Sequence, residues 1–151
     1  MSTTETAKKA AWLVASLIMW IWQLPQNLVG LGVRAWYAGG AGSRRYEVRN
    51  KFGMRIEVTE CGMRGGISLG QTIVMHRCMR HDPLALPHEL GHTMQSMMLG
   101  PAYLLIVGLP SIAWAGMKSA GMWRGRDYYS FYTERWADKL SDIERRERKK
   151  M

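Results

Sequence analysis

His88-Glu89-Leu90-Gly91-His92 is the stretch that most constrains the fold of this chain. Residues four positions apart share one face of a helix, so His88 and His92 can direct two imidazole nitrogens at one metal ion. Glu89 then lies beside the metal, where a carboxylate can take a proton from an activated water and later pass one to a leaving amine. The stretch predicts a helix on which His88 and His92 bind Zn²⁺ and Glu89 is the catalytic residue.

The residues before this stretch favour a helix that begins nearby. Asp82-Pro83 is typical of an N-cap followed by proline at the first helical position, and Pro87 leaves open a restart of the helix at that point. Five-residue motifs also occur by chance, so the alternative interpretation is a surface helix with two unrelated histidines.

The motif at 88–92, together with Glu134-Arg135-Trp136-Ala137-Asp138, resembles the gluzincin zinc metallopeptidases, the broad group that includes thermolysin. The resemblance implies that Glu134, on a later helix, is the third zinc ligand. It also implies that Asp138 accepts a hydrogen bond from the far nitrogen of a ligand histidine. The implied activity is zinc-dependent hydrolysis of peptide bonds in a peptide or protein substrate. The chain departs from the family in size, because it lacks the large second half that usually builds the substrate cleft.

Two other families of zinc peptidase are excluded by the residues that follow the motif. The metzincin pattern requires Gly at position 95 and His at position 98, where this chain has Gln95 and Met98. Apolar segments beside the motif also resemble the membrane-embedded site-2 proteases, but the Leu-Asp-Gly segment that supplies their third ligand is absent.

The region before the motif predicts a small sheet. Apolar residues alternate from Tyr46 to Thr59 around a turn at residues 50–53, and a further strand is expected over 67–75, entered at Gly65-Gly66 and interrupted at Gly70-Gln71. If the strand from Gly66 lies at the sheet edge, it can pair with an extended substrate, and otherwise it is an ordinary strand. A single C-terminal helix is expected from Asp127 to about Lys149.

Two long segments, uncharged over residues 10–33 and 93–117, flank the sheet and the motif. Residues 10–37 are expected to form an apolar N-terminal anchor, broken near Pro25, and residues 93–117 an apolar helical hairpin that reverses at Gly108-Leu109-Pro110. Several Trp residues resemble interfacial anchors, which favours membrane association. The alternative for each segment is a pair of short helices buried in a soluble core.

The composition sets further limits. The chain has 151 residues, of which 47% are hydrophobic, and a formal net charge of +9. One domain is therefore expected over 1–151, and a disordered chain is excluded. The distribution of Lys and Arg predicts a cytoplasmic catalytic face at a membrane. Nucleic acid is an unlikely partner, because the basic residues are spread out and no nucleic-acid motif is present. Two cysteines, Cys61 and Cys78, cannot form a disulfide scaffold, and free thiols are expected.

Other residues are given structural roles. His76 and His81 are interpreted as polar loop residues. The tyrosines Tyr128, Tyr129 and Tyr132 are interpreted as core residues, with the alternative that one of them donates to a reaction intermediate. The basic tail at 144–150 is a solvated helix end or a contact with anionic lipid.

The predicted fold class is α+β: a small antiparallel sheet packed on the motif helix and on a C-terminal ligand helix, with apolar helical segments. The predicted function is a membrane-associated zinc peptidase. The alternative is a non-catalytic, membrane-associated interaction module with a structural or vestigial metal site.

Overall fold

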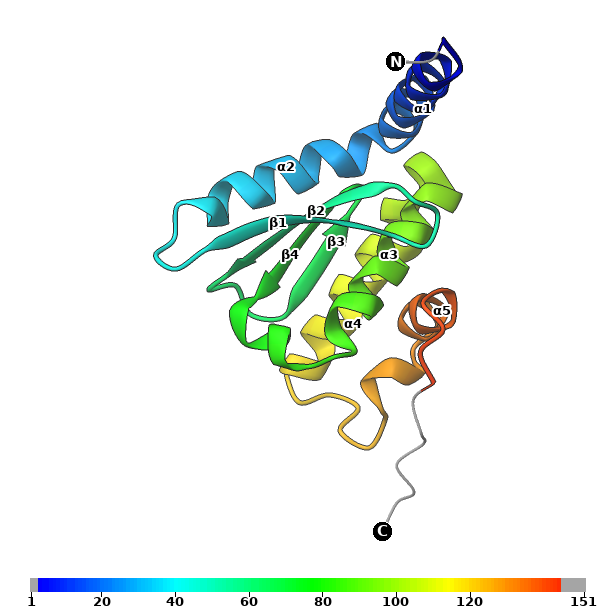
Figure 1. Cartoon of the computed structure of the whole chain (residues 1–151). Helices are drawn as coiled ribbons and strands as arrows, with labels where there is room; N and C mark the ends of the chain where they lie inside the picture. Colours follow the sequence, from blue (N-terminus) through cyan, green and yellow to red (C-terminus); the bar gives the residue numbers. More distant parts are fainter. Residues whose placement is uncertain (1–2, 145–151) are drawn as a thin grey trace.

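The structure is a computed structural model and describes residues 3–144 (Figure 1). Its helices are α1 (Thr3–Trp22), α2 (Leu24–Ala38), α3 (Ala85–Leu99), α4 (Leu109–Ser119) and α5 (Tyr132–Leu140). Its strands are β1 (Arg44–Arg49), β2 (Arg55–Cys61), β3 (Gly66–Leu69) and β4 (Thr72–His76). Shorter helical turns cover Arg77–His81, Gly100–Ala102, Leu104–Gly108 and Tyr128–Ser130. The predicted α+β class is confirmed.

The four strands form one sheet in the order β1-β2-β4-β3. β1 and β2 are antiparallel across the predicted turn at 50–53, and β3 and β4 are antiparallel, but β2 and β4 are parallel. The prediction of a purely antiparallel sheet is therefore wrong. The expected interruption at Gly70-Gln71 is confirmed, since Gly70, with a positive φ of 61°, makes a tight turn between β3 and β4. β4, almost entirely buried, then takes the inner position, and β3 becomes the edge.

Helices cover both faces of this sheet (Figure 1). On one face, Ile56, Val58, Ile73 and Met75 form the main apolar core with the start of α3. On the other face α2 crosses the sheet, and it lies so close at Gly30 that a Cβ there would crowd β3 and β4. α3 packs against β3 on the face opposite α2, and this contact positions the motif beside the edge strand.

The N-terminal segment breaks near the predicted proline. α1 ends at Trp22 and α2 begins at Leu24. The residues that this segment buries most deeply are polar: Gln23, Gln26 and Asn27. Within residues 3–144, no helix combines the length and the apolar character needed to cross a bilayer. Membrane association of residues 10–37 therefore stays a prediction.

The segment 93–117 does turn back, but not at the predicted place. The chain reverses after α3 at Gly100, which has a φ of +52°. Gly108 and Leu109 keep right-handed helical angles, so the turn Leu104–Gly108 continues into α4. This turn is π-helical, an adjustment that accommodates Pro110 without ending the helix. Pro110 therefore does not mark the place where the chain reverses.

The C-terminal helix is shorter than predicted. Phe131 has extended angles (φ −66°, ψ 144°) and separates the turn Tyr128–Ser130 from α5. α5 ends at Leu140, where the Ser141 hydroxyl donates to the carbonyl of Pro87. A single helix from Asp127 is therefore wrong, and its expected end at 145–149 lies outside the described residues.

Candidate metal centre

α3 carries the motif through the centre of the molecule. The Asp82 carboxylate accepts from the Leu84 amide at 2.9 Å and orders the turn before the helix, which begins at Ala85 rather than at Pro83. His88, Glu89 and His92 are all buried on the helix. Gly91, between them, faces Ala137 of α5, and a Cβ on Gly91 would overlap the Ala137 backbone. The glycine of the motif therefore permits the close crossing of α3 and α5.

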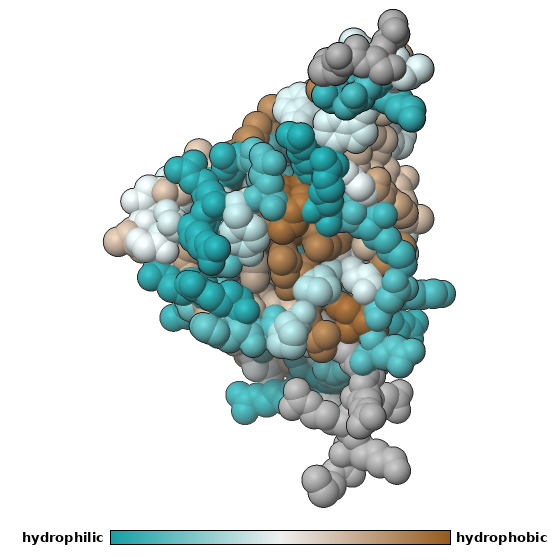
Figure 2. Space-filling model, in the orientation of Figure 1, coloured by the Kyte–Doolittle hydropathy of each residue, from teal (hydrophilic) through white to brown (hydrophobic). Residues whose placement is uncertain are grey.

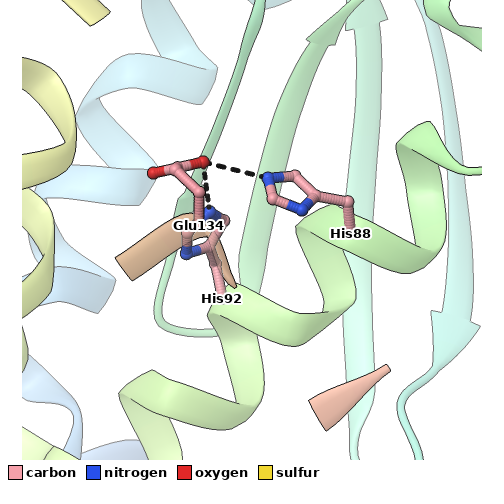
Figure 3. A group of neighbouring side chains, drawn as sticks. All are labelled: His88, His92 and Glu134. Atoms are coloured by element: carbon pink, nitrogen blue, oxygen red, sulfur yellow. Dashed lines mark hydrogen bonds and ion pairs between the residues drawn. The ribbon is translucent and has the colours of Figure 1, made fainter. Parts of the chain in front are cut away.

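This crossing brings Glu134 to the two histidines (Figure 3). Glu134 Oε2 lies 3.1 Å from His88 Nε2 and 3.4 Å from His92 Nε2. Within the described residues these three buried side chains form a group that could hold a metal ion, with ligand atoms within 4.8 Å of one another. Donor atoms bound tetrahedrally to one Zn²⁺ are separated by about 3.3 Å. The donor set and its spacing fit zinc.

The far nitrogens of both histidines are held by α5 and by α3 itself. His88 Nδ1 lies 2.7 Å from Asp138 Oδ1, and His92 Nδ1 lies 2.7 Å from Gln95 Oε1. The Gln95 amide nitrogen donates to the Thr133 carbonyl at 2.8 Å, which fixes the amide so that its oxygen faces His92. Each Nδ1 is thereby occupied by an oxygen partner, and each Nε2 faces the Glu134 carboxylate, where a protonated ring donates to it and a neutral ring offers a lone pair to a metal ion.

Glu134 is ionised in this setting. Burial opposes ionisation of its carboxyl, but hydrogen bonds with His88 and His92 hold its pKa far below the usual range. Its other oxygen, Oε1, accepts from Ser111 Oγ at 2.8 Å. For His92, burial alone would lower the pKa, and the Glu134 carboxylate outweighs burial and raises it. Two imidazole nitrogens and an ionised carboxylate thus meet at one point, an arrangement suited to hold a cation in place of the ring protons.

No protein-family model, curated protein or solved structure matches this chain. The interpretation of the site therefore rests on its geometry alone. That geometry brings together His88, His92, Glu134 and Asp138, and their roles in binding and chemistry stay predictions.

A cavity of about 260 Å³ opens beside the three ligand atoms. Glu89 lines it, and Ser68 Oγ of β3 donates to Glu89 Oε2 at 2.6 Å. Gly66 lies so close to Glu89 that a Cβ there would overlap the carboxylate. The edge strand therefore positions Glu89 in two ways: Ser68 donates a hydrogen bond to its carboxylate, and Gly66, which has no side chain, leaves room for it.

The tyrosines before Glu134 divide into two groups. Tyr128 and Tyr129 line the cavity, and the Tyr129 ring packs edge-on against His88 with centroids 5.2 Å apart. Burial raises the pKa of Tyr128, so its hydroxyl stays protonated at neutral pH. The Tyr132 hydroxyl instead donates to the Ile106 carbonyl.

The remaining candidates lie apart from the ligand group. His76 ends β4 with its Nδ1 2.7 Å from Cys78 Sγ, and His81 ends the following turn. Cys61 is buried and Cys78 exposed, and both are free, as expected.

Two residues that hold the ligands were not found by sequence reasoning. Gln95 was used only to exclude a family, although its spacing of three from His92 places the two on one helix face. Ser111 carries the one hydroxyl in the apolar run 104–117. A single polar side chain in such a run could have indicated a contact with a buried polar group.

Proposed function

We propose that this protein is a zinc-dependent peptidase of the gluzincin type, with His88, His92 and Glu134 as the metal ligands. The observation that carries the proposal is the meeting of three ligand atoms in a cavity that Glu89 also lines. When bound, zinc would supply Lewis-acid polarisation of a substrate carbonyl and a lowered pKa for a water molecule.

Glu89 is the proton carrier in this proposal. It adjoins His88 in sequence and lines the same cavity, so its carboxylate can accept a proton from the attacking water. The same group can then deliver a proton to the leaving amine. The hydrogen bond from Ser68 Oγ occupies Oε2, which orients the carboxylate and leaves Oε1 for this exchange.

The edge strand β3 offers a place for an extended peptide. The Gly65 carbonyl accepts from the amide of His76, the last residue of β4. Hydrogen-bonded and non-hydrogen-bonded pairs alternate along an antiparallel ladder, so the backbone groups of Gly66 and Ser68 point outward, away from β4. The Ser68 carbonyl already accepts from the Tyr103 hydroxyl at 2.8 Å. Gly66 is therefore the residue of β3 that would pair with a substrate strand, directly beside Glu89.

Tyr128 is the candidate for stabilising the charge that develops on the substrate oxygen. It lines the cavity near Glu134, and its raised pKa keeps the hydroxyl as a donor. Replacement by Phe should lower kcat with little effect on zinc content, as expected for a donor that acts in the transition state.

Elemental analysis of the purified full chain tests the ligand set. We expect about one zinc per chain in the wild type and a sharp loss in Glu134→Gln. Glu47→Gln, an exposed carboxylate on β1, is the matched control and should keep its zinc. Absence of zinc from the wild type, or zinc content indifferent to Glu134, would refute the proposal.

Hydrolysis of a quenched-fluorescent peptide library tests the reaction. Glu89→Gln should keep its zinc and lose cleavage by about two to four orders of magnitude, because the proton carrier is gone. Full activity in that variant would end the mechanism. A wild type that holds zinc with no exchangeable water and cleaves nothing would instead support the non-catalytic interaction module.

A further inference from the structure

α1 exposes a broad apolar surface. Leu13, Val14, Leu17, Ile18 and Ile21 each have between 57% and 63% of their surface exposed. At 3.6 residues per turn these five side chains span about two fifths of the helix circumference. α1 projects from the rest of the molecule, so the described chain does not cover this surface (Figure 1).

The apolar surface continues beyond α1. At its end the Trp22 indole donates to the Met97 carbonyl at 3.0 Å, and the ring lies against Gly100, where the chain leaves α3. Beyond this turn, Leu105 and Leu109 are 71% and 59% exposed. In Figure 2 hydrophilic residues cover much of the visible face, and hydrophobic atoms show in its middle and also along its right edge. Trp22 thus ties the end of α1 to the turn that leads from α3 into residues 104–119.

Cations gather on the face of α1 opposite this apolar surface, near the start of the helix. Lys8, Lys9, Arg49 and Arg55 line a depression with Glu5, beside Leu13. The guanidinium groups of Arg49 and Arg55 lie over the Trp12 ring, 5.4 and 5.2 Å from its centroid. A wide apolar face on one side of α1, with four cations against one carboxylate on the other, is the arrangement of a helix that lies in the surface of an anionic bilayer.

We propose that α1 and the exposed side of residues 104–119 dock on an anionic lipid bilayer. The apolar side chains enter the boundary of the acyl chains, and the cationic cluster contacts lipid phosphates. The same surface reaches the candidate site, because Ile112 is 54% exposed and also lines the cavity. If the proposed peptidase function holds, the docked enzyme acts on polypeptides held at the membrane surface.

Flotation of the full chain with vesicles tests the docking surface. Protein purified in detergent is diluted into vesicles of phosphatidylcholine, alone or with phosphatidylglycerol. The wild type should float with the anionic vesicles, and Leu17→Glu should lower the bound fraction about tenfold by placing a charge in hydrocarbon. Leu84→Glu, the same change at the opposite end of α3 from Gly100, should float like the wild type. Replacing both Arg49 and Arg55 with Gln should weaken binding to the anionic vesicles only.

Three outcomes would overturn the proposal. They are a wild type that does not float, a Leu17→Glu variant that floats equally well, and a wild type that self-associates without lipid and becomes monomeric on that substitution. The last would assign the surface to a second copy of the chain. Because Leu17 is exposed, circular dichroism and zinc content should be unchanged in the variant, which separates failure of docking from failure of the peptidase proposal.

Discussion

At the scale of residues, Gln95 determines which nitrogen of His92 can face the metal. Gln95→Met removes the acceptor for His92 Nδ1 while nearly preserving volume. We expect zinc affinity to fall about 10- to 100-fold, because loss of such a partner frees the ring to rotate or change tautomer. Competition against a fluorescent chelator measures this. Met98→Gln, exposed on the same helix, is the control, and an equal loss there would rule out the specific role of Gln95.

Gly91 is the second residue with a measurable role. Gly91→Ala would push α3 away from the Ala137 backbone, which cannot yield as a flexible side chain would. We expect a loss of about 1–3 kcal/mol in the free energy of unfolding, together with weaker zinc binding. Urea denaturation measures the first effect. Gly116→Ala in α4 has no neighbour within 4 Å and should be neutral or stabilising, so equal effects at both glycines would contradict this explanation.

The residues that meet at the candidate site were predictable only in part. A spacing of four along a helix is a local property, so His88 and His92 could be placed on one face from sequence. Glu134 and Asp138 depended on a resemblance, because contact across more than 40 positions leaves no periodic signal. Ser111 reaches Glu134 from a segment whose apolar character indicated a membrane or a core.

At the scale of elements, turns explain most of the differences between prediction and structure. The turn at Gly70, an expected interruption, folds β4 back between β2 and β3, where it pairs in parallel with β2 and makes the sheet mixed. Gly100, rather than the later Gly108-Leu109-Pro110 segment, reverses the chain, because its positive φ ends α3 sharply. Alternation and helical periodicity identified the elements, but they could not show where tertiary contacts end them.

α5 should depend on the bound ion more than the sheet does. It packs mainly on α3, and if the proposed metal is bound, the buried Glu134 carboxylate and two imidazoles lose their shared partner when a chelator removes it. We expect amide exchange in Tyr132–Leu140 to rise at least about tenfold, while β2 and β4 in the main core stay protected. Hydrogen exchange read by mass spectrometry distinguishes the segments. Unchanged α5 protection, or loss throughout the sheet, would contradict this view.

At the scale of the whole molecule, zinc should raise global stability by mass action. A ligand at a thousandfold excess over its Kd adds about 4 kcal/mol when it binds the folded state alone. We therefore expect the Tm of the wild type to rise with zinc concentration and that of Glu134→Gln to stay nearly constant. Differential scanning calorimetry at several zinc concentrations measures this. A Tm independent of zinc in the wild type would oppose a site formed by the fold.

The two ligand-bearing helices also define a loop. His92 and Glu134 are 42 positions apart (134 − 92), and both cysteines are free. An ion held by both would close that loop as a cross-link does, restricting the unfolded chain by roughly 4 kcal/mol on the scale used for disulfides. In a reducing compartment, where disulfides do not persist, the proposed metal would cross-link the two helices of a small chain as well as supply its chemistry.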